Sequence, residues 1–200
     1  MPRRSGAPSP GQLSLHLVDD PAAIRDLLID QLRHAGHAGR LIPEMGLCQG
    51  DARIDLAEIG PTLDGYEIKS ERDDLRRLPR QTEVYNRIFD RLTLVTAARH
   101  LKHGASCVPE WWGIALVNGE SGAIEDVRPA VLNPSRDPLA TVRLLWRDEA
   151  ADLLERHLGQ RVRATRPVLW RRLVEILPPD ELSRSVAACL TVRAAWRAAG

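Results

Sequence analysis

The chain lacks the features of small proteins that are stabilised by disulfides or zinc. Its cysteines, Cys48, Cys107 and Cys189, are odd in number and form no CxxC pair, which argues against both a disulfide framework and a zinc knuckle. The six histidines have no partner cysteines at ligand spacing. We therefore expect reduced cysteines and no metal site built from cysteine and histidine.

Long apolar runs are also missing. No stretch approaches the ~20 apolar residues that a membrane-spanning helix requires. The start of the chain, MPRRSGAPSPGQ, contains two arginines but no apolar signal core. We therefore interpret residues 1–18 as a flexible leader and expect a cytoplasmic protein with no membrane partner.

Neither positive nor negative charge predominates over the whole chain, because the formal net charge is only +1. By itself this value gives no indication of a nucleic-acid partner. The distribution is uneven, however, since residues 160–200 contain eight arginines and three acids, a local balance of +5. Apolar residues make up 44% and charged residues 28% of the chain, which is typical of a folded globular protein.

Apolar periodicity and turn residues predict an α/β protein with a helical extension. Asp20-Pro21 resembles a helix start, and helical spacing continues to near Gly36. Strands are predicted at 41–47, 52–59, 64–70, 92–97 and 111–117. Further helices are predicted at 73–90, 138–158, 167–177 and 180–198.

A proline-containing segment, residues 128–138, is the best candidate for a boundary. We therefore divide the chain into the leader 1–18, a core over 19–130 and a basic helical subdomain over 138–200.

The stretch YEIKSE, residues 66–71, places two charges in a strand-like run. Alternate side chains of a strand share a face, so Glu67 and Lys69 point to one side and their neighbours to the other. If the preceding strand forms a hairpin centred on Pro61, Asp55 lies opposite Glu67. Like charges about 4.5 to 5.5 Å apart destabilise a strand pair. A cation is therefore expected there, either Lys69 or a divalent ion such as Mg²⁺ or Mn²⁺.

Gln81 and Tyr85 lie four residues apart on one face of the following predicted helix. Gln81 falls inside the apolar arc, and a buried amide needs a hydrogen-bond partner. Two interpretations stay open at this point: a contact to neighbouring backbone, or a position facing the same cleft as Glu67.

These residues resemble the PD-(D/E)XK nuclease superfamily, whose restriction-endonuclease-like core has the order helix, three-strand meander, helix, strand. Asp55 followed by Glu67-x-Lys69 matches its motif, and Gln81-x-x-x-Tyr85 resembles the QxxxY motif of the RecB-like branch. Ile54 stands where the superfamily has a proline. The string from RIDLAEIG to YNRIFD, continued by VPEWWGIALV, is also similar to a poorly characterised bacterial family, the sce-type family, over about residues 20–197.

The resemblance implies a Mg²⁺- or Mn²⁺-dependent deoxyribonuclease. Asp55, Glu67 and the backbone carbonyl of Ile68 would bind the metal, and Lys69 would orient or deprotonate the attacking water. Gln81 and Tyr85 would belong to the same catalytic site. An additional acidic ligand is expected from Glu44, Asp26 or Asp30, with Glu44 preferred.

Several arginines near this motif are predicted to bind DNA phosphates without sequence preference. They are Arg53, Arg72, Arg76, Arg77 and Arg80. Two alternatives stay open: a weak or inactive nuclease-fold protein that binds DNA or a protein partner, and an ion pair in which Lys69 serves only the fold. Substrate ends, strandedness and oligomeric state are not encoded in these patterns.

Overall fold

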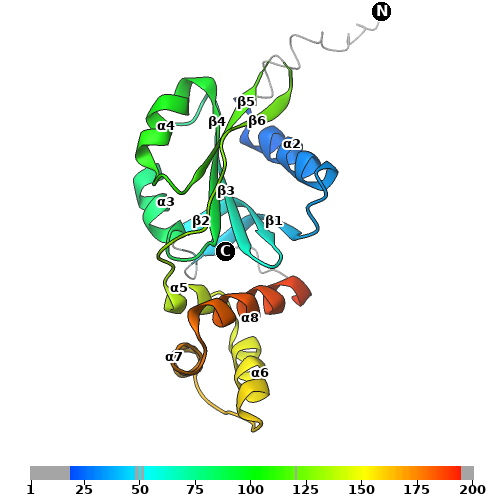
Figure 1. Cartoon of the computed structure of the whole chain (residues 1–200), viewed down its shortest axis with the longest axis vertical. Helices are drawn as coiled ribbons and strands as arrows, with labels where there is room; N and C mark the ends of the chain where they lie inside the picture. Colours follow the sequence, from blue (N-terminus) through cyan, green and yellow to red (C-terminus); the bar gives the residue numbers. More distant parts are fainter. Residues whose placement is uncertain (1–18, 48–49, 51, 120, 195–200) are drawn as a thin grey trace, which may run out of the picture.

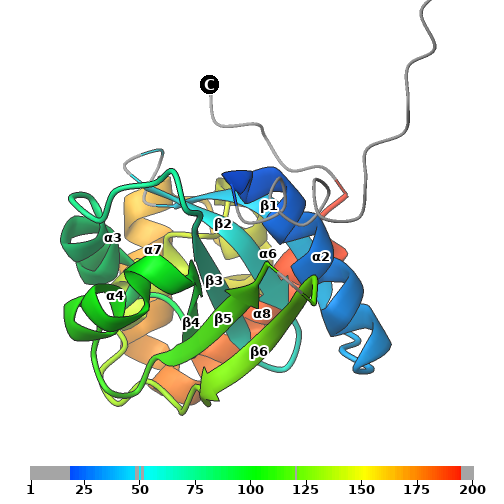
Figure 2. The ribbon, with the colours of Figure 1, turned by 90° about the horizontal axis from the view of Figure 1, so that it is seen from above.

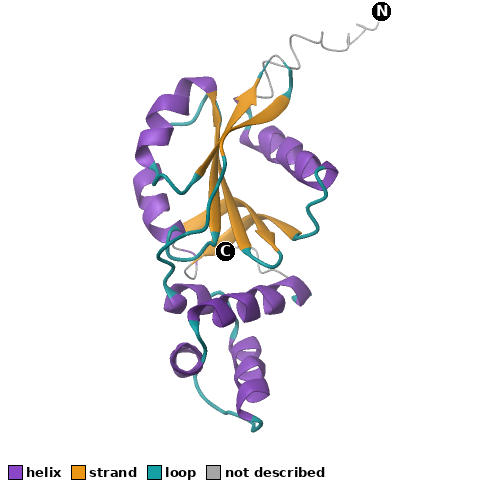
Figure 3. Ribbon diagram, viewed as in Figure 1, coloured by secondary structure: helices purple, strands orange, loops and turns teal. Residues whose placement is uncertain are grey.

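The computed structural model describes residues 19–47, 50, 52–119 and 121–194. Within them the protein is a mixed α/β structure in which one six-stranded sheet carries helices on both faces (Figures 1 and 3). Further helices lie beyond one end of the sheet. The expected α/β class with C-terminal helices is confirmed. No helix in these ranges has the length and apolar character needed to cross a membrane.

The strands follow one another across the sheet in chain order. The first three form an antiparallel meander, β3 pairs in parallel with β4 and β4 with β5, and β6 returns antiparallel to β5. Their bounds are β1 Arg40–Leu47, β2 Ala52–Ile59, β3 Leu63–Lys69, β4 Arg91–Ala97, β5 Gly113–Asn118 and β6 Ala123–Arg128. The five predicted strands are confirmed with shifts of one or two residues. Strand β6 was not predicted because none of its residues is buried.

The helices are α2 Pro21–His34, α3 Leu78–Tyr85, α4 Leu101–Cys107, α5 Pro138–Val142, α6 Arg147–Leu158, α7 Arg166–Ile176 and α8 Pro179–Val192. A short 3-10 turn, Ala98–His100, precedes α4. The predicted start of α2 is confirmed, because Pro21 is its first residue and the Asp20 carboxylate accepts a hydrogen bond from the Ala22 N–H at 2.9 Å.

Two predicted helices were too long. The helix predicted at 73–90 spans only 78–85, because the Asp73 carboxylate closes a turn on the Ser70 N–H and hydroxyl, both at 2.7 Å. Pro79 has no N–H to donate, so it is tolerated in the first turn of α3, where N–H groups have no partner within the helix. The helix predicted at 138–158 divides into α5 and α6, because Glu149 accepts from the Trp146 N–H at 2.7 Å and starts a new helix.

Helix α4 was not predicted, since its seven residues include Gly104. A Cβ at this glycine would lie 2.8 Å from a Leu94 methyl carbon, so the helix packs closely on β4. The helix predicted at 180–198 was also too long, because α8 ends at Val192 and Arg193 is extended. Residues 195–198 lie outside the described residues, as do the leader and Cys48. Cys107 and Cys189 are free thiols, the latter buried.

The two faces of the sheet are covered by separate apolar clusters. On one face α2 packs its buried Ile24, Leu28 and Leu32 against a cluster that includes Tyr66 and Ile68 of β3. The cluster on the other face holds α3 and continues without interruption into buried residues of α6, α7 and α8. The C-terminal helices therefore share a core with the sheet.

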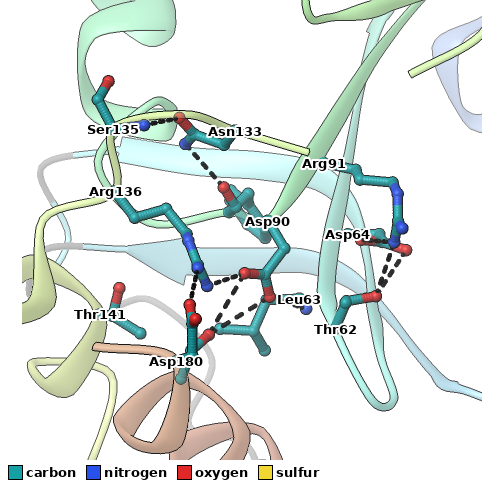
Figure 4. A network of polar contacts seen from close by, with 12 residues as sticks. Thr62, Leu63, Asp64, Asp90, Arg91, Asn133, Ser135, Arg136, Thr141 and Asp180 are labelled. Carbon is teal, nitrogen blue, oxygen red and sulfur yellow. Dashed lines mark hydrogen bonds and ion pairs between the residues drawn. The ribbon is translucent and has the colours of Figure 1, made fainter. Parts of the chain in front are cut away.

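A buried polar network also joins these helices to the sheet (Figure 4). Asp90, just before β4, accepts a hydrogen bond from the Leu63 N–H at 2.7 Å. Its other carboxylate oxygen pairs with Arg136, whose guanidinium also donates to Asp180 of α8 at 2.6 Å. The Ser183 hydroxyl of α8 lies 3.4 Å from both Asp90 oxygens. Asp90 thus fixes the start of β4 and α8 together.

Candidate active site

Strand register places three acids in one row. Leu56 faces Tyr66 and Ala57 faces Gly65, which confirms the predicted hairpin register and puts Asp55 opposite Glu67 when it is continued. On the other side of β2, Pro43 faces Leu56 and Met45 faces Ile54. Glu44 therefore falls opposite Asp55. The row runs across β1, β2 and β3.

This row opens into a cleft of about 800 Å³. Its walls are formed by the ends of β1 to β3, the turn after β3 and helix α3. The predicted site residues among its lining are Glu44, Arg53, Asp55, Glu67, Ile68, Lys69, Arg77, Arg80 and Gln81. The structure therefore brings most of the predicted site together.

Lys69 and Glu67 form a buried ion pair within this cleft. The Lys69 ammonium lies 2.7 Å from Glu67 Oε1, and the two side chains are only 5% and 1% exposed. Lys69 Nζ also donates to the Gln81 side-chain carbonyl at 3.2 Å. Of the cations expected beside the acids, Lys69 is therefore present. Its contacts hold it at the base of the cleft.

Tyr85 restrains the Glu67 carboxylate through a hydrogen bond. Its hydroxyl lies 3.0 Å from Glu67 Oε2 and 2.6 Å from the Arg53 carbonyl oxygen, and it accepts a hydrogen bond from Gln81 Nε2 at 3.3 Å. Having one hydrogen, the hydroxyl can donate to either oxygen. Of the two interpretations of Gln81, the one that places it in the cleft with Glu67 is confirmed.

Burial raises the pKa of both central acids. Burial, followed by the negative charge of Glu67, raises the pKa of Asp55 to about 7, although the Ile68 N–H and Lys69 oppose the shift. The pKa of Glu67 is also raised by burial, although Lys69 and Tyr85 oppose the shift. Asp55 Oδ2 accepts from the Ile68 N–H at 2.7 Å. Both carboxyl groups thus hold a proton more readily than exposed ones, and a second cation beside them would favour their ionised form.

The donor set of this pair fits Mg²⁺ or Mn²⁺. Two carboxylates and a backbone carbonyl, that of Ile68, are hard oxygen ligands, and Mg²⁺ is commonly held by one or two carboxylates while it keeps several waters. The described ranges contain no group of three or more His, Cys, Asp or Glu side chains that could hold a metal ion. The row of Glu44, Asp55 and Glu67 is therefore not such a group.

Glu44 lines the cleft, but other charges engage its carboxylate. Arg25 of α2 lies 2.9 Å from one oxygen and Arg53 lies 3.1 Å from the other. Neither Asp26 nor Asp30 lines the cleft. Arg25 was missed in the sequence because its partner Glu44 is 19 positions away, and only the packing of α2 on the sheet brings the two together.

The five predicted phosphate-binding arginines divide into two groups. Arg53, Arg77 and Arg80 line the cleft. Arg72 instead lies 2.8 Å from Asp19, and Arg76 lies 2.7 Å from Asp74. Both were predicted to lie in the same helix as Arg77 and Arg80, but residues 70–77 form a turn that directs them elsewhere. Asp73, which closes this turn, also lines the cleft and was not predicted.

Comparison with known proteins gives two matches. The model of a family described as Bacteriophage P4 protein cII matches residues 20–195. Protein cII of Enterobacteria phage P4 is 36% identical over 59 residues, so the aligned part covers 30% of this chain and only 22% of that relative. No solved structure matches at a significant level. Neither description states an activity.

Proposed function

The chain belongs to the bacteriophage P4 protein cII family, and we propose that it is a metal-dependent nuclease of the PD-(D/E)XK type that hydrolyses phosphodiester bonds of DNA. The observation that carries the proposal is the convergence of Asp55, Glu67 and Lys69 at the base of one cleft, with arginines in its wall. A fold alone does not establish an activity.

The arrangement of the elements supports this proposal. Helix α2, the antiparallel meander β1 to β3, helix α3 and the parallel strand β4 follow the order of a restriction-endonuclease-like core. The motif residues lie on β2 and β3 at the positions that this core would require. Gln81 contacts Lys69 and Tyr85 contacts Glu67, which is consistent with a QxxxY pair that serves this site.

In the proposed reaction each side chain has a separate task. A divalent ion held by Asp55 and Glu67 would supply an acidified water and neutralise charge on the scissile phosphate. Lys69, an ammonium fixed by Glu67 and Gln81, donates hydrogen bonds that orient the attacking water or a phosphate oxygen. Arg53 and its neighbours in the wall hold flanking phosphates by charge-assisted hydrogen bonds.

Tyr85 and the Ile68 N–H act as positioning groups. The tyrosine hydroxyl restrains Glu67, and the backbone N–H of β3 restrains Asp55 at 2.7 Å. Reacting groups that are already oriented avoid an entropic cost at the transition state. The site is therefore organised before substrate arrives.

A second candidate is a nuclease-fold protein that binds DNA or a protein partner without cleaving it. The observation in its favour is that both Glu67 oxygens already have partners, Lys69 and Tyr85. The two candidates differ in whether Asp55 is needed for a reaction or only for a charged surface.

The deciding experiment is cleavage of circular and linear, single- and double-stranded DNA with Mg²⁺ or Mn²⁺ by wild type and Asp55→Asn. The asparagine oxygen can still accept from the Ile68 N–H, and the change removes repulsion with Glu67. We therefore expect an unchanged or higher melting temperature together with loss of cleavage.

Asp64→Asn is the matched control, because Asp64 lies on the same sheet outside the cleft lining and has a raised pKa of about 6. This variant should cleave like wild type. Cleavage by Asp55→Asn at the wild-type rate would overturn the proposed role of Asp55. Absence of wild-type cleavage on every substrate, with DNA binding retained, would instead support the second candidate.

A further inference from the structure

A basic surface lies on the C-terminal helices outside the cleft. Residues 160–174 contain five arginines and no acid. Four of them are exposed, and we call these four the arginine surface: Arg161, Arg163, Arg171 and Arg172.

The packing of this segment directs the arginines outward. In the extended stretch before α7, Val162 and Ala164 pack against the main core, so Arg161 and Arg163 alternate with them and face solvent. In α7 the side chains of Leu169, Trp170 and Leu173 are buried, which leaves Arg171 and Arg172 on the opposite side of the helix. Burial of the apolar residues therefore fixes the arginine surface in place.

Local carboxylates do not neutralise this surface. Among the described residues, no ion pair joins an arginine of the surface to an acid, whereas Arg147 lies 2.7 Å from Asp148 and Arg33 lies 3.8 Å from Asp30. The remaining arginine of the segment, Arg166, lies 4.8 Å from the centre of the Trp170 ring. The surface thus presents charge that is free to meet an anionic partner.

Two arginines of the surface belong to α7, which lies toward the same side of the molecule as one wall of the cleft. Helix α7 and helix α3, which forms a wall of the cleft, lie on the same side of the sheet in two perpendicular views (Figures 1 and 2). A DNA duplex is about 20 Å wide and repeats its phosphates along both strands, so one duplex can contact two separate basic regions of a protein.

We propose that the arginine surface binds backbone phosphates of duplex DNA and forms a second contact beside the cleft. This inference rests on the proposed function, because it takes DNA as the substrate. Guanidinium groups match phosphate geometry by paired hydrogen bonds. The other exposed positions of residues 160–176 are Gln160, Thr165, Pro167, Glu175 and Ile176. Ile176 is the one large apolar side chain among them, whereas a membrane-binding helix exposes a whole apolar face.

The test measures binding of a labelled 24-base-pair DNA duplex to the full chain by fluorescence anisotropy, in EDTA and over a range of salt concentrations. Without divalent ions, binding is read independently of cleavage. In the variant with all four arginines changed to Gln, affinity should fall at least tenfold. The slope of log affinity against log salt should become shallower by about 3.6, near 0.9 for each of the four lost phosphate contacts.

The control carries Arg33→Gln and Arg147→Gln, two arginines already paired with acids, and should keep the wild-type slope. An unchanged slope in the fourfold variant would overturn the proposal, as would an equal loss in the control. Stronger binding to anionic vesicles or to an RNA duplex of equal length would also overturn it. Retained Mg²⁺-dependent cleavage in the fourfold variant at high protein concentration would show that the nuclease proposal stands apart from this one.

Discussion

At the scale of single residues, burial sets the charge of carboxyl groups on both sides of β3. Asp64 lines a cavity of about 440 Å³ under α2. Thr62 donates a hydrogen bond to Asp64 Oδ2 at 3.2 Å and Arg91 lies 3.7 Å from Oδ1, but within the described residues Oδ1 has no hydrogen-bond partner. Burial raises the Asp64 pKa from 3.8 to about 6 despite these neighbours.

The raised pKa of Asp64 predicts that its ionisation lowers the free energy of unfolding. Because the folded carboxyl binds its proton more tightly than the unfolded one, folding stability falls as pH rises from about 4 to 6, and the loss is complete above that range. The shift corresponds to at most about 3 kcal/mol. Asp64→Asn should therefore match wild type near pH 4 and exceed its unfolding free energy at pH 7.5.

Urea unfolding of both proteins at the two pH values measures this difference. The gain should grow with pH. A stability gap of equal size at pH 4 and pH 7.5 would show that the asparagine acts through packing instead of through the charge.

At the scale of elements, the position of β3 depends on a glycine. A Cβ at Gly65 would lie 2.7 Å from a Leu92 methyl carbon, 3.0 Å from one of Ile54 and 3.1 Å from a Phe89 ring carbon. Gly65 is two residues before Glu67 and shares its face of the strand. Close packing at this glycine thus sets how deeply the active-site strand sits.

Gly65→Ala should cost about 1–3 kcal/mol of unfolding free energy through overpacking, and it should reduce cleavage through displacement of Glu67. Gly60→Ala is the matched control, because the nearest atom to its added Cβ would be 3.6 Å away. Thermal unfolding with parallel cleavage assays tests the pair. Equal stability of the two variants would show that β3 adapts to the extra methyl group.

The elements also show how far local patterns predict structure. The hairpin register was predicted from symmetry about Pro61, and it is correct because no bulge shifts the β2–β3 pairing. The length of α3 did not follow, since it depends on the contact of Asp73 with Ser70. For the same reason the sequence grouped Arg72 and Arg76 with the cleft, although the turn directs them elsewhere.

Contacts between side chains far apart in the sequence were the other feature that local patterns did not predict. Lys69 could be placed beside Glu67 because alternate residues of a strand share a face. For Gln81 and Tyr85 the helical periodicity left open whether they face the same cleft. The ion pair of Arg25 with Glu44 required the packing of α2 on the sheet, and no local pattern encodes it.

At the scale of the whole molecule, Asp90 connects the sheet with the C-terminal helices. It is buried, and it meets Arg136 and the Leu63 N–H at once. Removing one member of a buried ion pair leaves the other charge without compensation. The network should therefore control how firmly α8 is held.

Asp90→Ala should lower the unfolding free energy by about 3–5 kcal/mol and increase amide hydrogen exchange in α8 more than in β3. The control Asp148→Ala breaks an exposed pair with Arg147 and should cost less than about 1 kcal/mol. An equal rise in exchange in α8 and β3 would contradict a local role for Asp90.

The alternation of side chains along β3 restricts where chains of this family can accept insertions and deletions. One strand of seven residues carries Asp64 and Tyr66 toward α2 and Glu67 and Lys69 toward the cleft. A single insertion or deletion within the strand would exchange these two sets and bury the wrong groups on both faces. Related chains should therefore vary in length at the surrounding loops, while the spacing from Leu63 to Lys69 stays constant.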